Sequence, residues 1–188
     1  MANIKRKTRA ICEAAVSIAL ALALSFIKFK IWGEGGSVDF VMVPILVFAL
    51  RWGAGWGVLA GAVFGFLKCI LFEGLGYNWA SLFLDYVFAY GAVGLAGIFR
   101  GRSWGVVPGV ILGCLARYGF HCVSGVVLYA SYMPDIYMGI DMNNVWVYTL
   151  IYNGTYMLPN TLLAVIILIL LKKSMGRYIL AEDLAAVK

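Results

Sequence analysis

Long apolar segments joined by short polar links dominate this sequence. Hydrophobic residues make up 63% of the chain and charged residues only 13%, against about 25% in an ordinary soluble domain. The mean hydropathy is +0.92. A water-soluble fold of 188 residues needs far more polar surface, so the chain is predicted to fold in a lipid bilayer. The same pattern excludes a disordered chain, a disulfide-bonded miniprotein and a conventional soluble enzyme.

Six of the apolar segments are candidates for membrane helices. A helix needs about 20 apolar residues to cross the hydrocarbon core, with a range of about 17–25. The segment that begins near Asp39 and contains Pro44 is the weakest candidate because it is short. Together the segments predict an all-α polytopic membrane protein that forms one domain over residues 1–188. Their ranges are about 9–29, 38–52, 54–72, 79–99, 105–132 and 146–171.

The distribution of basic residues predicts the orientation of these spans. Six spans place both termini on one side, which holds eleven of the 15 Lys and Arg side chains. The other side holds Lys28, Lys30 and Lys68, and Arg117 lies inside a span. Because basic residues collect in cytoplasmic loops, both termini are predicted to be cytoplasmic. The net charge of +6 therefore reflects topology, and we expect no nucleic-acid partner. The basic run at Lys5 to Arg9 lacks the cleavage site of a signal peptide.

Two stripes of small residues occur at a spacing of four. Such stripes let helix backbones approach closely in lipid. In the third segment the stripe is expected to serve internal packing. In the first segment, internal packing and the docking of a partner protein remain equal alternatives. The glycine stripe is Gly57, Gly61 and Gly65, and the alanine stripe is Ala15, Ala19 and Ala23.

The four cysteines lie in or beside apolar runs, without a C-x-x-C motif or a histidine pair. They are expected to be small buried hydrophobes rather than disulfide partners or metal ligands, and no metal site is predicted. The cysteines are Cys12, Cys69, Cys114 and Cys122.

Few polar groups fall inside the predicted spans, and such groups mark function by default. Counted along helices from the aromatic residues at the span ends, Asp85, His121 and Asn153 reach similar depths in one half of the bilayer. The sequence therefore predicts a pocket that is open to the outside. The alternatives are that Asp85 forms a structural ion pair with Arg117, and that His121 is structural too.

The residue types in this pocket indicate the chemistry of a ligand. A carboxylate, an imidazole, an amide and several aromatic rings suit a flat, cationic heteroaromatic molecule. A cation over a desolvated ring gains about 2 kcal/mol or more, and an aminopyrimidine can donate paired hydrogen bonds to a buried carboxylate. Tyr148, Tyr152 and Tyr156 follow one another at helical spacing and could supply such rings.

Four stretches together resemble the thiamine-specific substrate-binding (S) component of energy-coupling factor (ECF) transporters. The resemblance covers nearly the whole chain, and the second and third stretches are fairly specific. The stretches are WGEGGSVDFVMVPILVFALRWG (32–53), LDYVFAYGAVGLAG (84–97), RYGFHCVSGVVLY (117–129) and VYTLIYNGTYMLPN (147–160).

The resemblance implies an S-component fold in a bacterial cell membrane and a high affinity for thiamine, without a catalytic site or a cofactor. It also implies that the first helix docks through Ala15, Ala19 and Ala23 to an ECF module, which consists of a transmembrane coupling subunit and two ABC-type ATPases. The family is expected to have Glu where Asp85 stands and Trp where Tyr129 stands. The implied thiamine-binding residues are Trp32, Glu34, Asp85, Tyr86, His121, Tyr129, Tyr148 and Asn153.

Three other functions remain open on the sequence. One is an S-component for another vitamin or precursor, such as a hydroxymethylpyrimidine. Another is a small membrane enzyme with His121 and Asp85 as acid–base groups, although the sequence shows no nucleophile set, metal motif or phosphate loop. An autonomous channel or carrier is disfavoured because neither an inverted repeat nor a polar row across the membrane is evident.

Overall fold

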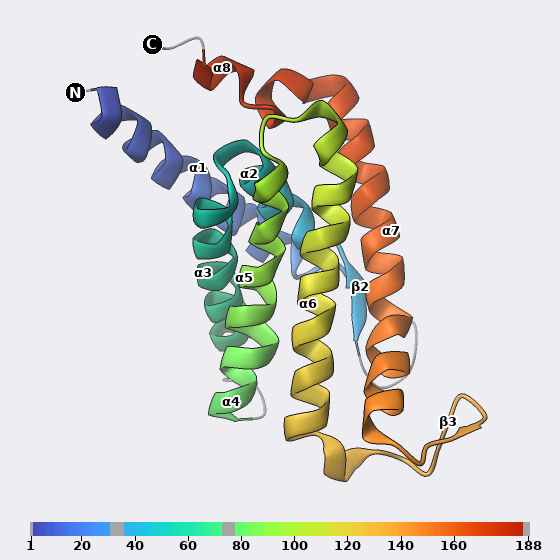
Figure 1. Cartoon of the computed structure of the whole chain (residues 1–188). Helices are drawn as coiled ribbons and strands as arrows, with labels where there is room; N and C mark the ends of the chain where they lie inside the picture. The colour runs from blue at the N-terminus through green and yellow to red at the C-terminus, as the bar shows by residue number, and fades with distance from the viewer. Residues whose placement is uncertain (1, 31–35, 73–77, 186–188) are drawn as a thin grey trace.

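Long helices that run side by side form the body of the protein (Figure 1). The computed structural model describes residues 2–30, 36–72 and 78–185. Helices α3 (Ala54–Phe72), α6 (Val106–Leu128) and α7 (Val145–Ile179) match three predicted spans, although α6 ends before residue 132 and α7 continues beyond residue 171. Both chain ends lie at the same end of the bundle.

The predicted span 79–99 is one continuous rod with three kinds of helical geometry. It runs through α4 (Trp79–Ser81), the π-helix η1 (Leu82–Phe88), α5 (Ala89–Val93) and the 3₁₀-helix η2 (Gly94–Phe99). The Asn78 side chain caps its start by accepting a hydrogen bond from the Ser81 backbone N–H. π-helical turns are rare and occur frequently at functional sites, and this one carries Asp85 and Tyr86.

Two small hairpins at the ends of the helices were not predicted. The first candidate span is helix α1 (Ala2–Leu24), which ends five residues early because the chain turns into β1 (Lys28–Lys30), paired antiparallel with β2 (Ser37–Asp39). The second hairpin pairs β3 (Ile136–Tyr137) with β4 (Ile140–Asp141). The remaining short elements are η3 (Ser103–Gly105), η4 (Ala130–Tyr132) and α8 (Glu182–Ala185).

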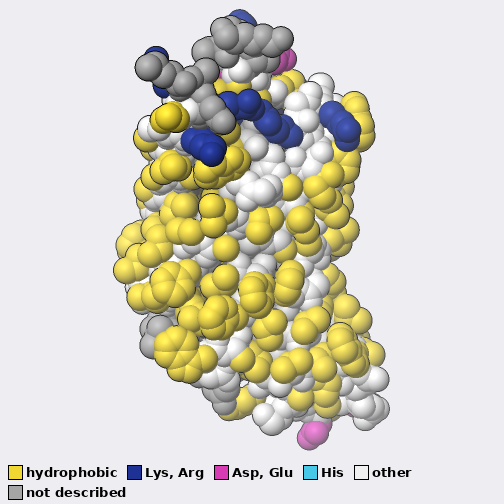
Figure 2. Space-filling model, turned by 60° about the vertical axis from the view of Figure 1, so that its left-hand side comes forward, with side chains coloured by type: hydrophobic (Ala, Val, Ile, Leu, Met, Phe, Trp, Pro, Cys, Tyr) yellow, Lys and Arg dark blue, Asp and Glu magenta, His cyan; other side chains and the backbone are white. Residues whose placement is uncertain are grey.

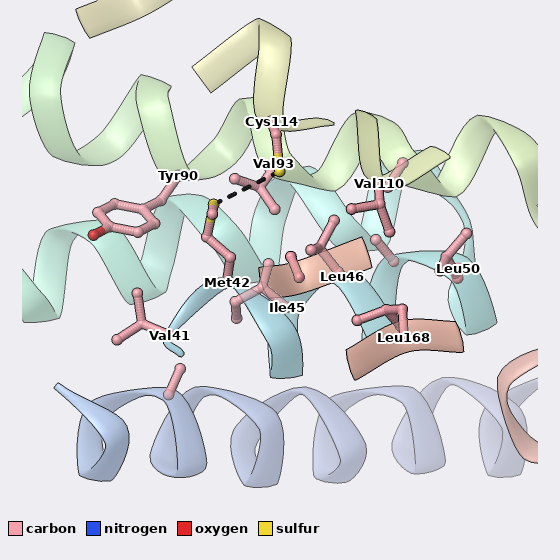
Figure 3. Close-up of a cluster of buried hydrophobic side chains, with 14 of the residues drawn as sticks. Val41, Met42, Ile45, Leu46, Leu50, Tyr90, Val93, Val110, Cys114 and Leu168 are labelled. Carbon is pink, nitrogen blue, oxygen red and sulfur yellow. Dashed lines mark hydrogen bonds between the residues drawn. The ribbon is translucent and has the colours of Figure 1, made fainter. Parts of the chain in front are cut away.

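Helix α2 (Met42–Trp52) lies in the interior rather than at the lipid surface. Its 11 residues extend only about 16 Å, at a rise of about 1.5 Å per residue. Figure 3 shows its side chains packed among those of the surrounding helices, with Met42 Sδ 4.0 Å from Cys114 Sγ. A helix that is apolar all round is buried, and this property makes α2 the centre of the core.

The surface has the apolar character that a bilayer requires. Four described helices are long and apolar enough to cross a membrane: Ala54–Phe72, Trp79–Phe99, Ser103–Leu128 and Val145–Leu184. In the face shown in Figure 2, hydrophobic side chains cover the middle, and Lys and Arg gather toward one end. This arrangement matches a protein whose body lies in hydrocarbon and whose basic end lies at the membrane surface.

Arg51 joins the helices at the end that carries the termini. Its guanidinium is completely buried and contacts Glu13 and Asp183, each at 2.6 Å, and the Tyr178 carbonyl oxygen at 2.6 Å. The Trp52 indole N–H also donates to Glu13, at 2.7 Å. From the sequence, Arg51 was counted among the basic residues in loops on the side that carries the termini. The structure instead places its side chain inside the protein, where it links α1, α2 and α8.

The outcome for the cysteines is mixed. Cys69, Cys114 and Cys122 are buried free thiols, as predicted, whereas Cys12 is exposed. The expectation that all four are buried was therefore wrong for Cys12, because its side chain lies on the face of α1 that points away from the other helices.

The glycine stripe of α3 serves internal packing, as predicted. A Cβ atom at Gly61 would overlap the backbone carbonyl of Tyr90, and one at Gly65 would overlap that of Tyr86. The stripe therefore sets how closely α3 approaches η1 and α5, which carry pocket residues.

We expect Gly61→Ala to destabilise the protein by about 1–3 kcal/mol, because rigid backbone cannot move away from the added methyl group. Gly55→Ala is the matched control on the same helix, since a Cβ there meets nothing within 4 Å. The control should be neutral or slightly stabilising. Thermal unfolding in detergent measures both variants, and equal melting temperatures would contradict the packing role.

Candidate functional site

A cavity of about 730 Å³ opens among the ends of the helices that lie away from the termini. Its volume falls in the range typical of small-molecule sites, about 300–1,000 Å³. Charged and aromatic side chains from four helical rods and from the first hairpin line it. The charged and imidazole groups on its wall are Lys28, Lys30, Asp39, Lys68, Asp85, Arg117 and His121.

A continuous chain of hydrogen bonds runs along the wall of this cavity. At one end, Asp85 Oδ1 lies 3.1 Å from His121 Nδ1, and His121 Nε2 lies 3.2 Å from Arg117 Nε. Because the guanidinium can only donate, Nε2 accepts, which assigns the imidazole proton to Nδ1 and directs it toward Asp85. The imidazole of His121 therefore lies between Asp85 and Arg117. The ion pair of Asp85 with Arg117, which the sequence left as an alternative, is mediated by this imidazole rather than direct.

The same chain continues to a second carboxylate. The Tyr90 hydroxyl accepts hydrogen bonds from Arg117 Nη2 at 3.0 Å and from Lys68 Nζ at 2.6 Å. Lys68 Nζ also lies 3.5 Å from Asp39 Oδ2. The two cations, Arg117 and Lys68, lie between the two carboxylates, so the formal charges of these four groups cancel.

Asp85 is held by two serine hydroxyls besides its contact with His121 in this chain. Its Oδ2 accepts hydrogen bonds from the Ser81 hydroxyl at 2.9 Å and from the Ser124 hydroxyl at 2.7 Å, while Oδ1 faces His121. An ionised carboxylate offers about four acceptor positions. One position on Oδ1 therefore remains for a ligand that donates a hydrogen bond.

Arg117 presents a donor that the protein leaves without an acceptor. Its Nη1 is buried and has no hydrogen-bond partner in the described part of the chain, and its side chain lines the cavity. A buried donor without an acceptor costs about 1–3 kcal/mol, and more when it is charged. A ligand with an acceptor atom would remove this cost.

Four tyrosines form an aromatic wall that reaches the charged chain at Tyr156, whose ring centroid lies 6.0 Å from that of His121. Tyr137 of the second hairpin lies 5.5 Å from Tyr148 and 6.0 Å from Tyr152, measured between ring centroids. Tyr148 lies 5.6 Å from Tyr152, which lies 6.2 Å from Tyr156. The helical spacing predicted the row on α7, whereas Tyr137 joins it only through the fold.

Two asparagines of α7 fix the geometry of the wall. Asn153 donates to the Thr149 and His121 carbonyls at 2.8 and 3.4 Å, and accepts a hydrogen bond from the Tyr156 hydroxyl at 2.5 Å. Asn160 binds strand β2, donating to the Ser37 carbonyl at 2.9 Å and accepting from the Asp39 N–H at 3.0 Å. The two amides thus connect α7 to His121 on α6 and to strand β2, and so fix the position of the wall.

The structure brings most of the predicted site residues together. Trp32 and Glu34 lie outside the described residues. The other six line the cavity: Asp85, Tyr86, His121, Tyr129, Tyr148 and Asn153.

Sequence reasoning missed Lys68, Asp39 and Tyr90 as parts of this wall. Lys68 and Asp39 were counted as charges outside the membrane because they stand near the ends of apolar runs. The sequence did not show that these two side chains are buried, with only 12% and 4% of their surface accessible. Among the described residues, no group of three His, Cys, Asp or Glu side chains could hold a metal ion.

The fold and the cavity define a helical membrane protein with a cavity of the size of a small-molecule site. The family described as thiamine transporter protein (Thia_YuaJ) matches residues 11–180 of the chain. The chain belongs to this family, and it is accordingly a membrane transport protein rather than an enzyme.

Individual relatives agree with this assignment. The thiamine transporter ThiT of Bacillus subtilis is 32% identical over 174 residues, covering 85% of this chain and 88% of the relative. ThiT of Lacticaseibacillus paracasei is 32% identical over 190 residues, covering 92% and 91%. A solved structure of ThiT from Listeria monocytogenes shares the fold, with a TM-score of 0.81 at 24% identity, over 93% of this chain and 98% of that one.

We expect Tyr90→Phe to lower stability by about 1–3 kcal/mol, because it removes the acceptor that Lys68 and Arg117 share. Tyr118→Phe is the control, since its hydroxyl donates to the Leu150 carbonyl at the exposed side of the bundle. Melting temperatures of both variants in detergent provide the comparison. A smaller loss for Tyr90→Phe than for Tyr118→Phe would contradict a structural role for the chain of hydrogen bonds.

Proposed function

We propose that this protein is the thiamine-binding subunit of an ECF-type importer, which captures the vitamin in its cavity and relies on a separate ATPase module for uptake. The family assignment and the similarity to the thiamine transporter ThiT support thiamine as the ligand. The observation that carries the proposal is the cavity itself, in which one free acceptor position on Asp85 and one unpartnered donor on Arg117 lie near an aromatic wall.

The two unfilled hydrogen-bonding positions match an aminopyrimidine. Its amino group can donate to Asp85 Oδ1, and a ring nitrogen can accept from Arg117 Nη1. A neutral molecule that offers only acceptors would leave the Asp85 position unused. The aminopyrimidine end is therefore placed at the charged wall, beside Tyr86 and His121.

The aromatic wall suits the cationic thiazolium ring. Tyr148 and Tyr152 line the cavity, and a desolvated cation over the face of such a ring gains about 2 kcal/mol or more. Tyr129, whose hydroxyl lies 3.1 Å from that of Ser81, closes the wall near Asp85. Since the cavity lining has no excess of negative charge, attraction to the cation comes from these rings.

The predicted contact residues differ in how many hydrogen-bonding positions they have left for a ligand. The Asn153 amide already uses both N–H groups and one acceptor position within the protein. We assign it the task of holding His121 and Tyr156 in place, with one remaining acceptor position for the ligand. Trp32 and Glu34 are proposed as ligand contacts on the resemblance alone.

The proposed topology has six crossings in a bacterial cell membrane, with both termini in the cytoplasm. Four helices satisfy the length and hydropathy of a span. Helix α1 supplies a fifth crossing, and strand β2 together with α2 supplies the sixth, because α2 alone is too short to cross. The basic residues at the end that carries the termini support a cytoplasmic location for that end. The cavity then opens to the outside.

Helix α1 is the proposed docking surface for the coupling subunit. Ala15, Ala19 and Ala23 are all exposed, whereas Ala10 and Ala21 of the same helix are buried. The exposed alanines leave room for close approach of another helix in lipid. This exposure favours docking over internal packing, the alternative that the sequence left open.

Asp85→Ala should weaken thiamine binding at least about tenfold, or about 1.4 kcal/mol, because the ligand loses its acceptor. Asp85→Asn keeps the shape of the side chain, removes its charge and replaces one acceptor oxygen with an NH2 donor. Asp135→Ala is the control, an exposed carboxylate outside the cavity lining. Calorimetric titration of purified protein, with melting temperatures as a check of folding, measures all three. Unchanged affinity in both Asp85 variants would remove this residue from the site.

Ala15→Trp and Ala19→Trp should leave thiamine affinity intact and reduce uptake by cells at least about tenfold, because a bulky side chain prevents close helix contact. Leu115→Trp, on the exposed surface of α6, is the control and should transport normally. Normal uptake by both alanine variants would refute docking at this face.

A further inference from the structure

The turn of the second hairpin has an unusual composition for its geometry. Met138 and Gly139 connect β3 to β4 with φ angles of 53° and 78°. Two-residue turns with positive φ at both positions strongly favour Asn-Gly or Asp-Gly, because bulky residues are disfavoured in the left-handed region. Here the tip carries a methionine, 53% exposed, where a polar residue is expected in contact with water.

The residues beside the tip are apolar and exposed as well. Ile136 is 62% exposed and Ile140 is 50% exposed. Isolated exposed hydrophobic residues are ordinary, but here three of them surround one hairpin tip. The register pairs Ile136 with Asp141 and Ile140 with Tyr137, so the two isoleucines lie on opposite faces of the hairpin, on either side of Met138. This apolar patch around the tip indicates an apolar environment.

The position of the hairpin identifies that environment. It connects the end of α6 to the start of α7, and Figure 1 shows it projecting sideways beside the first turns of α7. Those turns expose Trp146, Val147 and Leu150, so the apolar patch continues the surface of a helix that is long enough to span the membrane. Tryptophan is enriched at the membrane–water interface, which places the hairpin at that depth.

We infer that the β3–β4 hairpin is seated in the bilayer, with Met138, Ile136 and Ile140 in the interfacial layer at the cavity end of the protein. Tyr137, between two of these residues, contacts Tyr148 and Tyr152 in the cavity wall. One hairpin therefore forms part of the ligand site and is held in place by lipid. Opening the wall at Tyr137 requires the tip to move within the bilayer surface.

The test places an environment-sensitive fluorophore on Met138→Cys in a Cys12→Ser background, since Cys12 is the exposed thiol among the described cysteines. The protein is reconstituted in phosphatidylcholine vesicles that carry a nitroxide quencher near the headgroup end of the acyl chain. Asn143→Cys, an exposed polar position on the link to α7, is the water-facing control. Leu158→Cys, an exposed position within α7, is the lipid-facing control.

We expect quenching by the nitroxide lipid to be at least about twofold stronger at position 138 than at position 143, with reduced quenching by aqueous iodide. Equal values at positions 138 and 143 would overturn the inference. Protection at position 138 from both quenchers would overturn it too, because it would indicate contact with protein. Ile140→Cys provides a second label site if Met138→Cys does not fold. No ligand is present, so the result is independent of thiamine binding.

Discussion

The cost of burying charge in a medium without water governs this structure. An isolated ion in an apolar interior is strongly disfavoured, so every buried charge needs a partner in good geometry. Two networks meet this requirement at opposite ends of the bundle. Near the termini, Arg51 joins Glu13 and Asp183. At the other end, the chain from Asp85 to Asp39 crosses the cavity wall. Each network takes residues from distant parts of the sequence and thereby fixes how the helices pack.

In the cavity network, two hydrogen-bonding positions are not filled, one on Asp85 and one on Arg117. These are the positions that we propose face the ligand. Three donors already position Asp85, and the imidazole of His121 is oriented from both sides. Such preorganisation lowers the cost of ordering side chains when a ligand binds. The exception is Nη1 of Arg117, which has no hydrogen-bond partner among the described residues. The site thus combines a rigid frame with two unfilled hydrogen-bonding positions.

Close backbone packing makes this arrangement possible. The glycines of α3 bring its backbone against η1 and α5, so Lys68 on α3 can reach Tyr90 on α5. The π-helical turn of η1 brings Asp85 within reach of Ser81 on α4 and of Ser124 and His121 on α6. Small residues and irregular helix geometry occur where the polar groups must meet, whereas the regular segments of α6 and α7 carry the apolar surface.

Hydropathy, charge pattern and helical spacing predicted the membrane class, the ranges of α3 and of the rod from Trp79 to Phe99, and three residues that line the cavity, Asp85, His121 and Asn153. These features follow from local composition and spacing, whereas Tyr86 and Tyr129 were predicted only through the resemblance to the family. Only the tertiary structure decided that α2 is an interior helix, that Lys68 and Asp39 are buried partners, and that Tyr137 completes the aromatic wall. In the sequence, a charged residue near the end of an apolar run does not reveal whether its side chain faces water or a buried partner. Its environment is set by long-range packing, which brings together residues far apart in the chain.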